Sequence, residues 1–96
     1  RSDEVSLLLF VIEGESLSEA MCMSVERAFE NCAWPRVEMA TMTDDLCYRH
    51  RVIGFPELHV IYGDETVHRI EGFETPDRVR AQVESLIAHE DKADKQ

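Results

Sequence analysis

Hydrophobic residues follow two different periods along this chain, and the changes of period outline its elements. Residues 5–12 form an almost unbroken apolar run, typical of a central strand covered on both faces. From Ser16 onward, apolar residues recur at helical spacing as far as Cys32. Ser16 followed by Glu19 has the form of a capping box, and Pro35 predicts that the helix ends within residues 31–35.

The second half of the chain predicts two more strands, a hairpin turn and two helices. Residues 37–41 alternate as a strand, and Asp44 with its neighbours caps a short helix that carries Leu46 and Cys47. Two period-2 segments, 58–62 and 66–70, flank Gly63-Asp64 and predict a hairpin. Thr75 and Pro76 begin the last helix, whose apolar stripe is Val79, Val83, Leu86 and Ile87.

The resulting order is β-α-β-α-β-β-α. A β-α-β-α start requires a parallel strand pair with a right-handed crossover, and the closing hairpin makes the sheet mixed. Helices on both faces then give an α/β/α sandwich of three layers around a four-stranded sheet. We expect residues 1–96 to form a single domain with its core at about 5–90.

Charge and cysteine content narrow the classes of function. The net charge of −10 argues against binding nucleic acid or an anionic membrane, and it favours a basic partner at most. No run of 18 apolar residues exists, so we expect no membrane span. Three cysteines without a C-x-x-C pair argue against a disulfide framework, and they predict a reducing, cytoplasmic location.

With this order, the chain resembles the thioredoxin superfamily over roughly residues 5 to 90. The resemblance rests on Gly54-Phe55-Pro56, which matches the glycine–apolar–proline loop whose proline is cis in the family. It rests also on Gly63-Asp64 in the hairpin turn and on Gly72 before the last helix. The amino-terminal strand and helix of longer thioredoxins have no counterpart in the match. The resemblance implies a thioredoxin-like fold.

The chain departs from the family where the redox chemistry is expected. The family's C-x-x-C pair falls on residues 16–19, its buried acid near Phe10 and its mid-helix proline near Ser24. Dithiol exchange needs a thiolate of low pKa at the helix start and a second thiol to resolve the mixed disulfide. A serine hydroxyl supplies neither. The sequence therefore predicts a divergent member without dithiol activity.

The remaining candidates for chemistry each have a structural explanation. Ser16 as a nucleophile competes with Ser16 as a helix cap, and Cys22 as a reactive thiol competes with Cys22 as a small core residue. Cys47 and His50 lie three apart on a helix and offer two metal ligands, but a site needs more. The acidic residues between 13 and 19 fit a solvated loop better than a carboxylate pair. We therefore expect no metal and no other cofactor.

The leading prediction is a redox-inactive module that binds a protein or peptide partner, or acts like a chaperone. Its surface would comprise the helix start and the proline loop, with Trp34 as a further apolar neighbour. The alternatives are a divergent monothiol or thiol–disulfide oxidoreductase that uses Cys22 or Cys47, and a structural domain of a larger protein or an oligomer. The surface residues of the leading prediction are Glu15, Ser16, Leu17, Ser18, Phe55 and Pro56.

Overall fold

The computed structural model describes the backbone of residues 5–32 and 35–94, and the side chains of residues 5–32 and 35–88. The predicted order β-α-β-α-β-β-α is confirmed. The elements are β1 (Val5–Val11), α1 (Ser16–Ala28), β2 (Arg36–Thr41), α2 (Asp45–Arg49), β3 (Glu57–Tyr62), β4 (Glu65–Glu71) and α3 (Pro76–Asp94).

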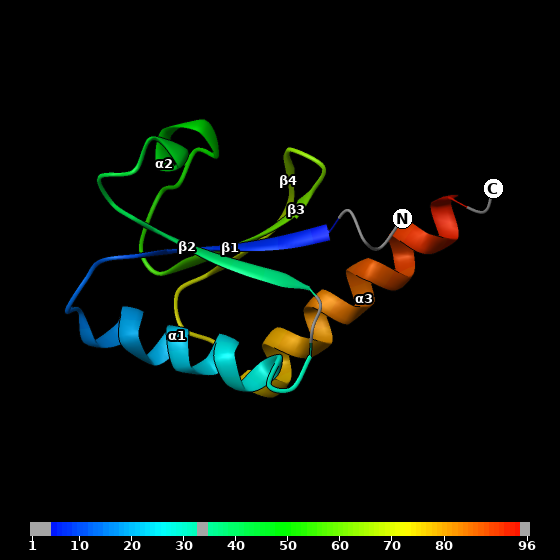
Figure 1. The fold of residues 1–96 in the computed structure, drawn as a ribbon, viewed down its shortest axis with the longest axis horizontal. Helices are drawn as coiled ribbons and strands as arrows, with labels where there is room; N and C mark the ends of the chain where they lie inside the picture. Colours follow the sequence, from blue (N-terminus) through cyan, green and yellow to red (C-terminus); the bar gives the residue numbers. More distant parts are fainter. Residues whose placement is uncertain (1–4, 33–34, 95–96) are drawn as a thin grey trace.

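The four strands form one mixed sheet in the order β2-β1-β3-β4. β1 pairs with β2 in parallel, while the β1–β3 and β3–β4 pairs are antiparallel. Helices α1 and α3 cover one face of the sheet and α2 lies over the other, so the three predicted layers are present (Figure 1). Within the described residues, no helix is both long enough and apolar enough to cross a membrane.

Both faces of β1 are buried, which explains its unbroken apolar sequence. Leu7 and Leu9 point to the face covered by α1 and α3, whereas Leu8 and Phe10 point to the face covered by α2. The predicted stripe of α3 is confirmed. On the first face, the strand side chains pack against these helix residues: Met21, Val25, Ala28, Val79, Val83, Leu86 and Ile87.

Both ends of α1 differ from the prediction. The residue at the N-cap is Glu15 rather than Ser16, because the Glu15 carboxylate accepts a hydrogen bond from the Ser18 N–H. The helix ends at Ala28, and Phe29 is its C-cap. Asn31 adopts a positive φ of 63°, which no helix accommodates and which asparagine tolerates better than most residues. The break therefore comes before Pro35.

Candidate functional site

Three of the connections at one end of the sheet form the candidate site. β1 ends at Val11, β3 begins at Glu57 and β4 ends at Glu71. Phe10 pairs with Glu57, and Glu57 pairs with Glu71, so these three strand ends lie side by side. Loops 12–15, 50–56 and 72–75 therefore gather at this end of the sheet, which we call the loop end.

The proline loop forms the centre of the loop end. The Phe55–Pro56 peptide bond is cis, and the Pro56 side chain is buried. The Gly72 N–H donates a hydrogen bond to the Pro56 carbonyl over 2.9 Å, which holds the loop after β4 against the proline loop. Gly72 has a φ of +76°, a conformation that favours glycine. A hollow of about 260 Å³ lies between these two loops.

Ile53 and Phe55 line this hollow, and further apolar side chains are exposed on the other segments of the loop end. Leu17 at the start of α1 is 48% exposed, Ile53 is 76% exposed and Phe73 is 45% exposed, while Phe55 is half-buried. We call these four residues the loop-end surface. Leu17 and Phe55 were predicted here, whereas Ile53 and Phe73 were missed, because single apolar residues in loops leave no periodic signal. Trp34, the other predicted apolar neighbour, lies outside the described residues.

The start of α1 is held by a short set of hydrogen bonds. The Ser18 hydroxyl donates to Glu15 Oε1 over 2.6 Å and accepts from the Ile12 N–H over 3.1 Å. Ser18 is consequently 1% exposed, and the Pro56 side chain is buried too. Both residues belong to the predicted binding surface, and their side chains add no exposed area to it. Ser16 is exposed and Glu15 is half-buried at the helix cap.

The three cysteines are free thiols and all of them are partly buried. Cys22 Sγ lies 3.6 Å from Met39 Sδ, and the Cys47 thiol donates to the Thr41 carbonyl over 3.2 Å. Burial raises the pKa of Cys22, and the carboxylates of Glu26 and Glu19 raise it further. Burial also raises the pKa of Cys47, with Asp44 as the next cause. Neither thiol is in a setting that favours the reactive thiolate.

Glu57 is the one buried acid among the described side chains, and sequence reasoning missed it. Its side chain is 1% exposed, directly after the cis proline. One carboxylate oxygen, Oε2, accepts hydrogen bonds from the N–H groups of Gly54 and Ile53, over 3.2 and 3.4 Å. The other oxygen, Oε1, accepts from His59 Nε2 over 2.6 Å and from Arg69 Nη1 over 3.3 Å. The carboxylate thus ties the proline loop to β3 and β4.

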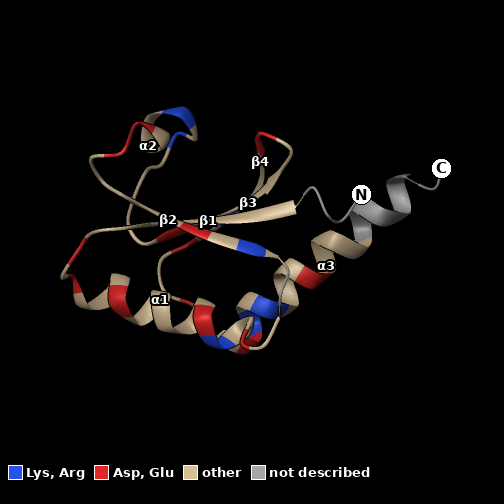
Figure 2. Cartoon of the chain, in the orientation of Figure 1, with Lys and Arg blue, Asp and Glu red and all other residues tan. Residues whose placement is uncertain are grey.

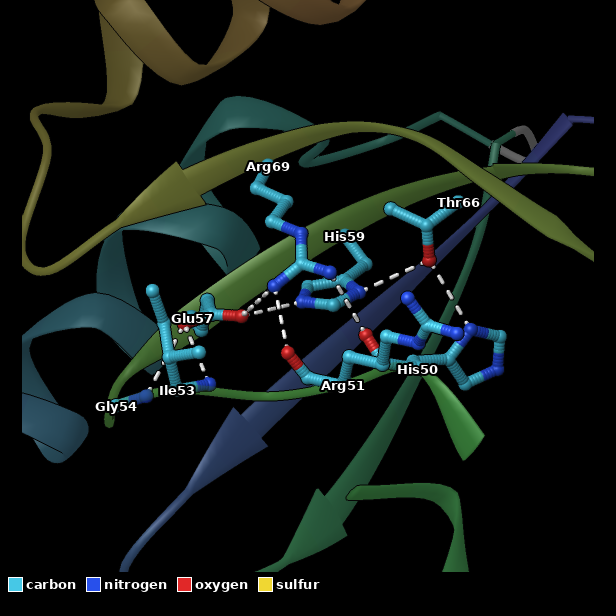
Figure 3. A network of polar contacts seen from close by, with 8 residues as sticks. All are labelled: His50, Arg51, Ile53, Gly54, Glu57, His59, Thr66 and Arg69. Carbon is cyan, nitrogen blue, oxygen red and sulfur yellow. Dashed lines mark hydrogen bonds and ion pairs between the residues drawn. The ribbon is translucent and has the colours of Figure 1, made fainter. Parts of the chain in front are cut away.

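Arg69 holds the beginning of the same loop. Its guanidinium donates to the carbonyl of Arg51 over 2.7 Å and to that of His50 over 3.0 Å (Figure 3). A guanidinium presents several donors in a fixed plane, so one side chain can bind a carboxylate and two carbonyls together. Residues 50–54 are therefore fixed by side chains from two neighbouring strands.

The two histidines of this cluster share one hydroxyl. His59 Nδ1 and His50 Nδ1 each lie 3.0 Å from Thr66 Oγ1. The Phe10 ring packs edge-on against His59, with ring centroids 4.8 Å apart, so the position of the family's acid is apolar here. Burial is the main cause that lowers the pKa of both His59 and His50.

A sequence signal for this cluster did exist. Glu57 and His59 occupy alternate positions in a strand whose other residues are apolar, and the predicted layers bury both faces of that strand. Polar groups in such a place must find partners, so they predict a buried network.

The two residues considered as metal ligands have other partners. Cys47 forms a hydrogen bond with Thr41, and His50 forms one with Thr66. Among the described side chains, no group of three His, Cys, Asp or Glu residues is arranged to hold a metal ion.

Comparison with solved structures places this architecture among thioredoxins and thioredoxin-fold proteins. The chain is 22% identical to chloroplastic thioredoxin z, with a TM-score of 0.69 over 90% of this chain and 80% of that one. A mutant thioredoxin from Halobacterium salinarum NRC-1 gives 22% identity, a TM-score of 0.67, and coverage of 86% of this chain and 74% of that one. Human ERp44 gives 15% identity and a TM-score of 0.70 over 90% of this chain and 28% of ERp44.

These likenesses define the class of fold. The chain has the thioredoxin-like fold, and its cysteines do not form a C-x-x-C pair. No family model matches the sequence, and no curated protein matches it.

Proposed function

We propose that this domain is a protein-binding module of the thioredoxin fold without dithiol chemistry, and that it binds an extended segment of a partner protein at the loop end. One observation carries the proposal: exposed Leu17, Ile53 and Phe73 belong to segments that meet at the loop end, and α1 begins there without a thiol. Exposed apolar groups that gather at one place are typical of interaction sites. The family's proline loop offers backbone groups to an extended peptide, which agrees with this placement.

The charge around the loop end indicates the chemistry of the partner. Acidic residues lie along the loop before α1 and in the first half of that helix (Figure 2). Glu71 and Glu74 add two more carboxylates on the side of β4. The proposed partner segment therefore carries apolar side chains flanked by lysine or arginine, since opposite charges steer association and favour the correct partner.

The alternative is a monothiol or thiol–disulfide oxidoreductase that uses Cys22 or Cys47. Such an enzyme needs a thiolate near neutral pH, and thiols reach that state at helix N-termini or beside cations. Cys22 lies inside α1 with two glutamates nearby, and Cys47 lies beside Asp44. Their surroundings raise both pKa values, so the binding module is the better-supported function.

Selection from a phage-displayed random peptide library tests the proposal. We expect the domain to enrich peptides that combine apolar and basic residues. A double variant, Ile53→Ser with Phe73→Ser, should weaken a selected peptide by roughly tenfold or more, because apolar contacts at an interface centre dominate its affinity. The matched control is Tyr48→Ser with Met23→Ser, which removes two exposed apolar side chains outside the loop-end surface. Failure to select any peptide, or equal affinity in both double variants, would overturn the proposal.

A further inference from the structure

An irregularity in the β3–β4 hairpin decides which side chains reach the buried cluster. Val60 pairs with His68 but Ile61 pairs with Thr66, so Val67 is an extra residue on β4. A shift of one residue moves the following side chains to the opposite face of a sheet. The bulge therefore places Thr66 on the same face as His59 and Arg69, while His68 points to the other face and contacts Gln82 of α3.

With Thr66 on this face, the hydrogen bonds have only one consistent direction when both rings are neutral. A carboxylate can only accept, so the proton of His59 is on Nε2 and faces Glu57 Oε1. The neutral ring then has a lone pair on Nδ1, which accepts from the Thr66 hydroxyl. The Thr66 oxygen in turn accepts from His50, whose proton is therefore on Nδ1. The series of hydrogen bonds runs from His50 through Thr66 and His59 to Glu57 (Figure 3).

Burial and the Arg69 guanidinium favour this neutral arrangement of the rings by lowering the pKa of both, whereas the Glu57 carboxylate acts in the opposite direction on the pKa of His59. His59 faces Glu57 from its own strand, Arg69 from β4 and His50 from the end of α2. His50 also feels Arg49, and Glu57 acts on Cys47 of α2. If both rings carried an extra proton, two cationic rings would lie beside the Arg69 guanidinium. Glu57, which binds His59 and Arg69, would be the carboxylate that faces these three positive charges.

This series of hydrogen bonds continues from Glu57 to the loop of residues 50–56, which carries part of the loop-end surface. Glu57 accepts from the N–H groups of Ile53 and Gly54 with the oxygen that His59 does not bind. Orienting one oxygen toward His59 fixes the direction of the other. The positions of Ile53 and of Phe55, two residues further along the loop, thus depend on the hydrogen bond between His59 and Glu57.

We propose that Thr66 and His59 are positioning residues for the loop-end surface. The Thr66 hydroxyl donates to His59 and fixes the tautomer of His50, His59 orients the Glu57 carboxylate, and Glu57 sets the position of residues 53–55. The inference rests on the proposed function for its effect on binding. The tautomers themselves can be measured without any partner.

Long-range ¹H–¹⁵N NMR of the histidine rings at pH 8 tests the positioning. We expect His50 to carry its proton on Nδ1 and His59 on Nε2. Thr66→Val keeps the shape but removes the hydroxyl, so the His50 tautomer should change and the amide signals of Ile53 and Gly54 should shift. Thr66→Ser keeps the hydroxyl and should retain both tautomers. The opposite tautomers in the wild-type protein, or an unchanged His50 tautomer in Thr66→Val, would overturn the inference.

The peptide selected by phage display gives the second readout. Thr66→Val should bind it about threefold to tenfold more weakly, and Thr66→Ser should bind it within about twofold of the wild-type affinity. If the wild-type protein binds no peptide, the proposed function fails and the NMR arm still decides the positioning. If Ile53 and Phe73 govern binding but Thr66→Val binds normally, the positioning fails and the proposed function stands. If Thr66→Val does not fold, the histidine tautomers of the wild-type protein and of Thr66→Ser decide whether the positioning is correct.

Discussion

Glu57 Oε1 and His59 Nε2 are joined by a hydrogen bond of 2.6 Å, and both side chains are removed almost completely from solvent. A buried carboxylate is costly unless its oxygens are fully bound, and here Arg69 and two loop N–H groups complete the set. The pair is therefore a point where stability and the shape of the proline loop depend on the same contacts.

Replacing this carboxylate should destabilise the domain even when its shape is kept. Glu57→Gln replaces one of the two carboxylate oxygens by an NH₂ group. This group then faces a donor, either His59 or the N–H groups of the loop. We expect a loss of about 1–3 kcal/mol in the free energy of unfolding, the usual cost of leaving buried polar groups unpaired. Urea unfolding measures it. Glu65→Gln on the exposed part of β4 is the control and should stay within about 0.5 kcal/mol of wild type. Equal effects of both changes would contradict the prediction.

Acidification should destabilise the domain through His50 and His59. Burial lowers both pKa values in the folded state, so the unfolded chain binds more protons. The stability that the neutral rings contribute is fully present above the unfolded value of about 6.5. It is lost as the pH falls from there through the lowered folded values. Urea unfolding at pH values from 8 to 5 should show this slope.

Replacing His59 shows how much of the pH dependence of stability comes from its ring. His59→Gln retains a donor for Glu57 but cannot take up a proton. Its stability should therefore depend less on pH between 8 and 5 than that of the wild-type protein. An identical slope in the two proteins would assign the acid sensitivity to other groups.

The thiols should react slowly in the folded state. Burial, reinforced by Glu26 and Glu19 at Cys22 and by Asp44 at Cys47, raises both pKa values. Because the thiolate is the reactive form, iodoacetamide should modify both thiols at pH 7 more slowly than it does in the urea-unfolded chain. Mass spectrometry of tryptic peptides gives the rates. A thiol that reacts faster in the folded protein would instead support the oxidoreductase.

The helix cap offers a direct comparison between adjacent residues. Glu15→Ala removes the acceptor for the Ser18 N–H and hydroxyl, and we expect it to cost about 1 kcal/mol, as cap deletions usually do. Ser16→Ala changes an exposed side chain at the first helical position and should stay within about 0.5 kcal/mol. Thermal unfolding followed by circular dichroism measures both. A larger loss for Ser16→Ala would restore Ser16 as the cap.

Most of the fold could be predicted from the sequence because its elements follow strong local rules. The unbroken apolar run of β1 requires cover on both faces, and the two period-2 segments around Gly63 permit only a tight hairpin. The cap of α1 was misplaced by one residue because Ser16 with Glu19 and Glu15 with Ser18 offer similar chemistry. Which pair forms depends on the direction of the chain leaving β1.

The buried cluster could not be assembled from local rules. His59 meets Thr66 only because the hairpin shifts register at Ile61, and Arg69 reaches the loop before β3 from another strand. A single extra residue in a strand carries little signal in the sequence. The polar residues could have been recognised as a buried set, but their partners required the three-dimensional pairing.

The difference between the two faces of the sheet has an evolutionary consequence. The face under α1 and α3 is held by apolar contacts, so homologous sequences can drift there by exchanging side chains of similar volume. The opposite face joins Glu57, His59, Thr66 and Arg69 by directed hydrogen bonds. Descendants of this domain should therefore change those four positions together, and a one-residue deletion at Val67 should accompany loss of the whole set.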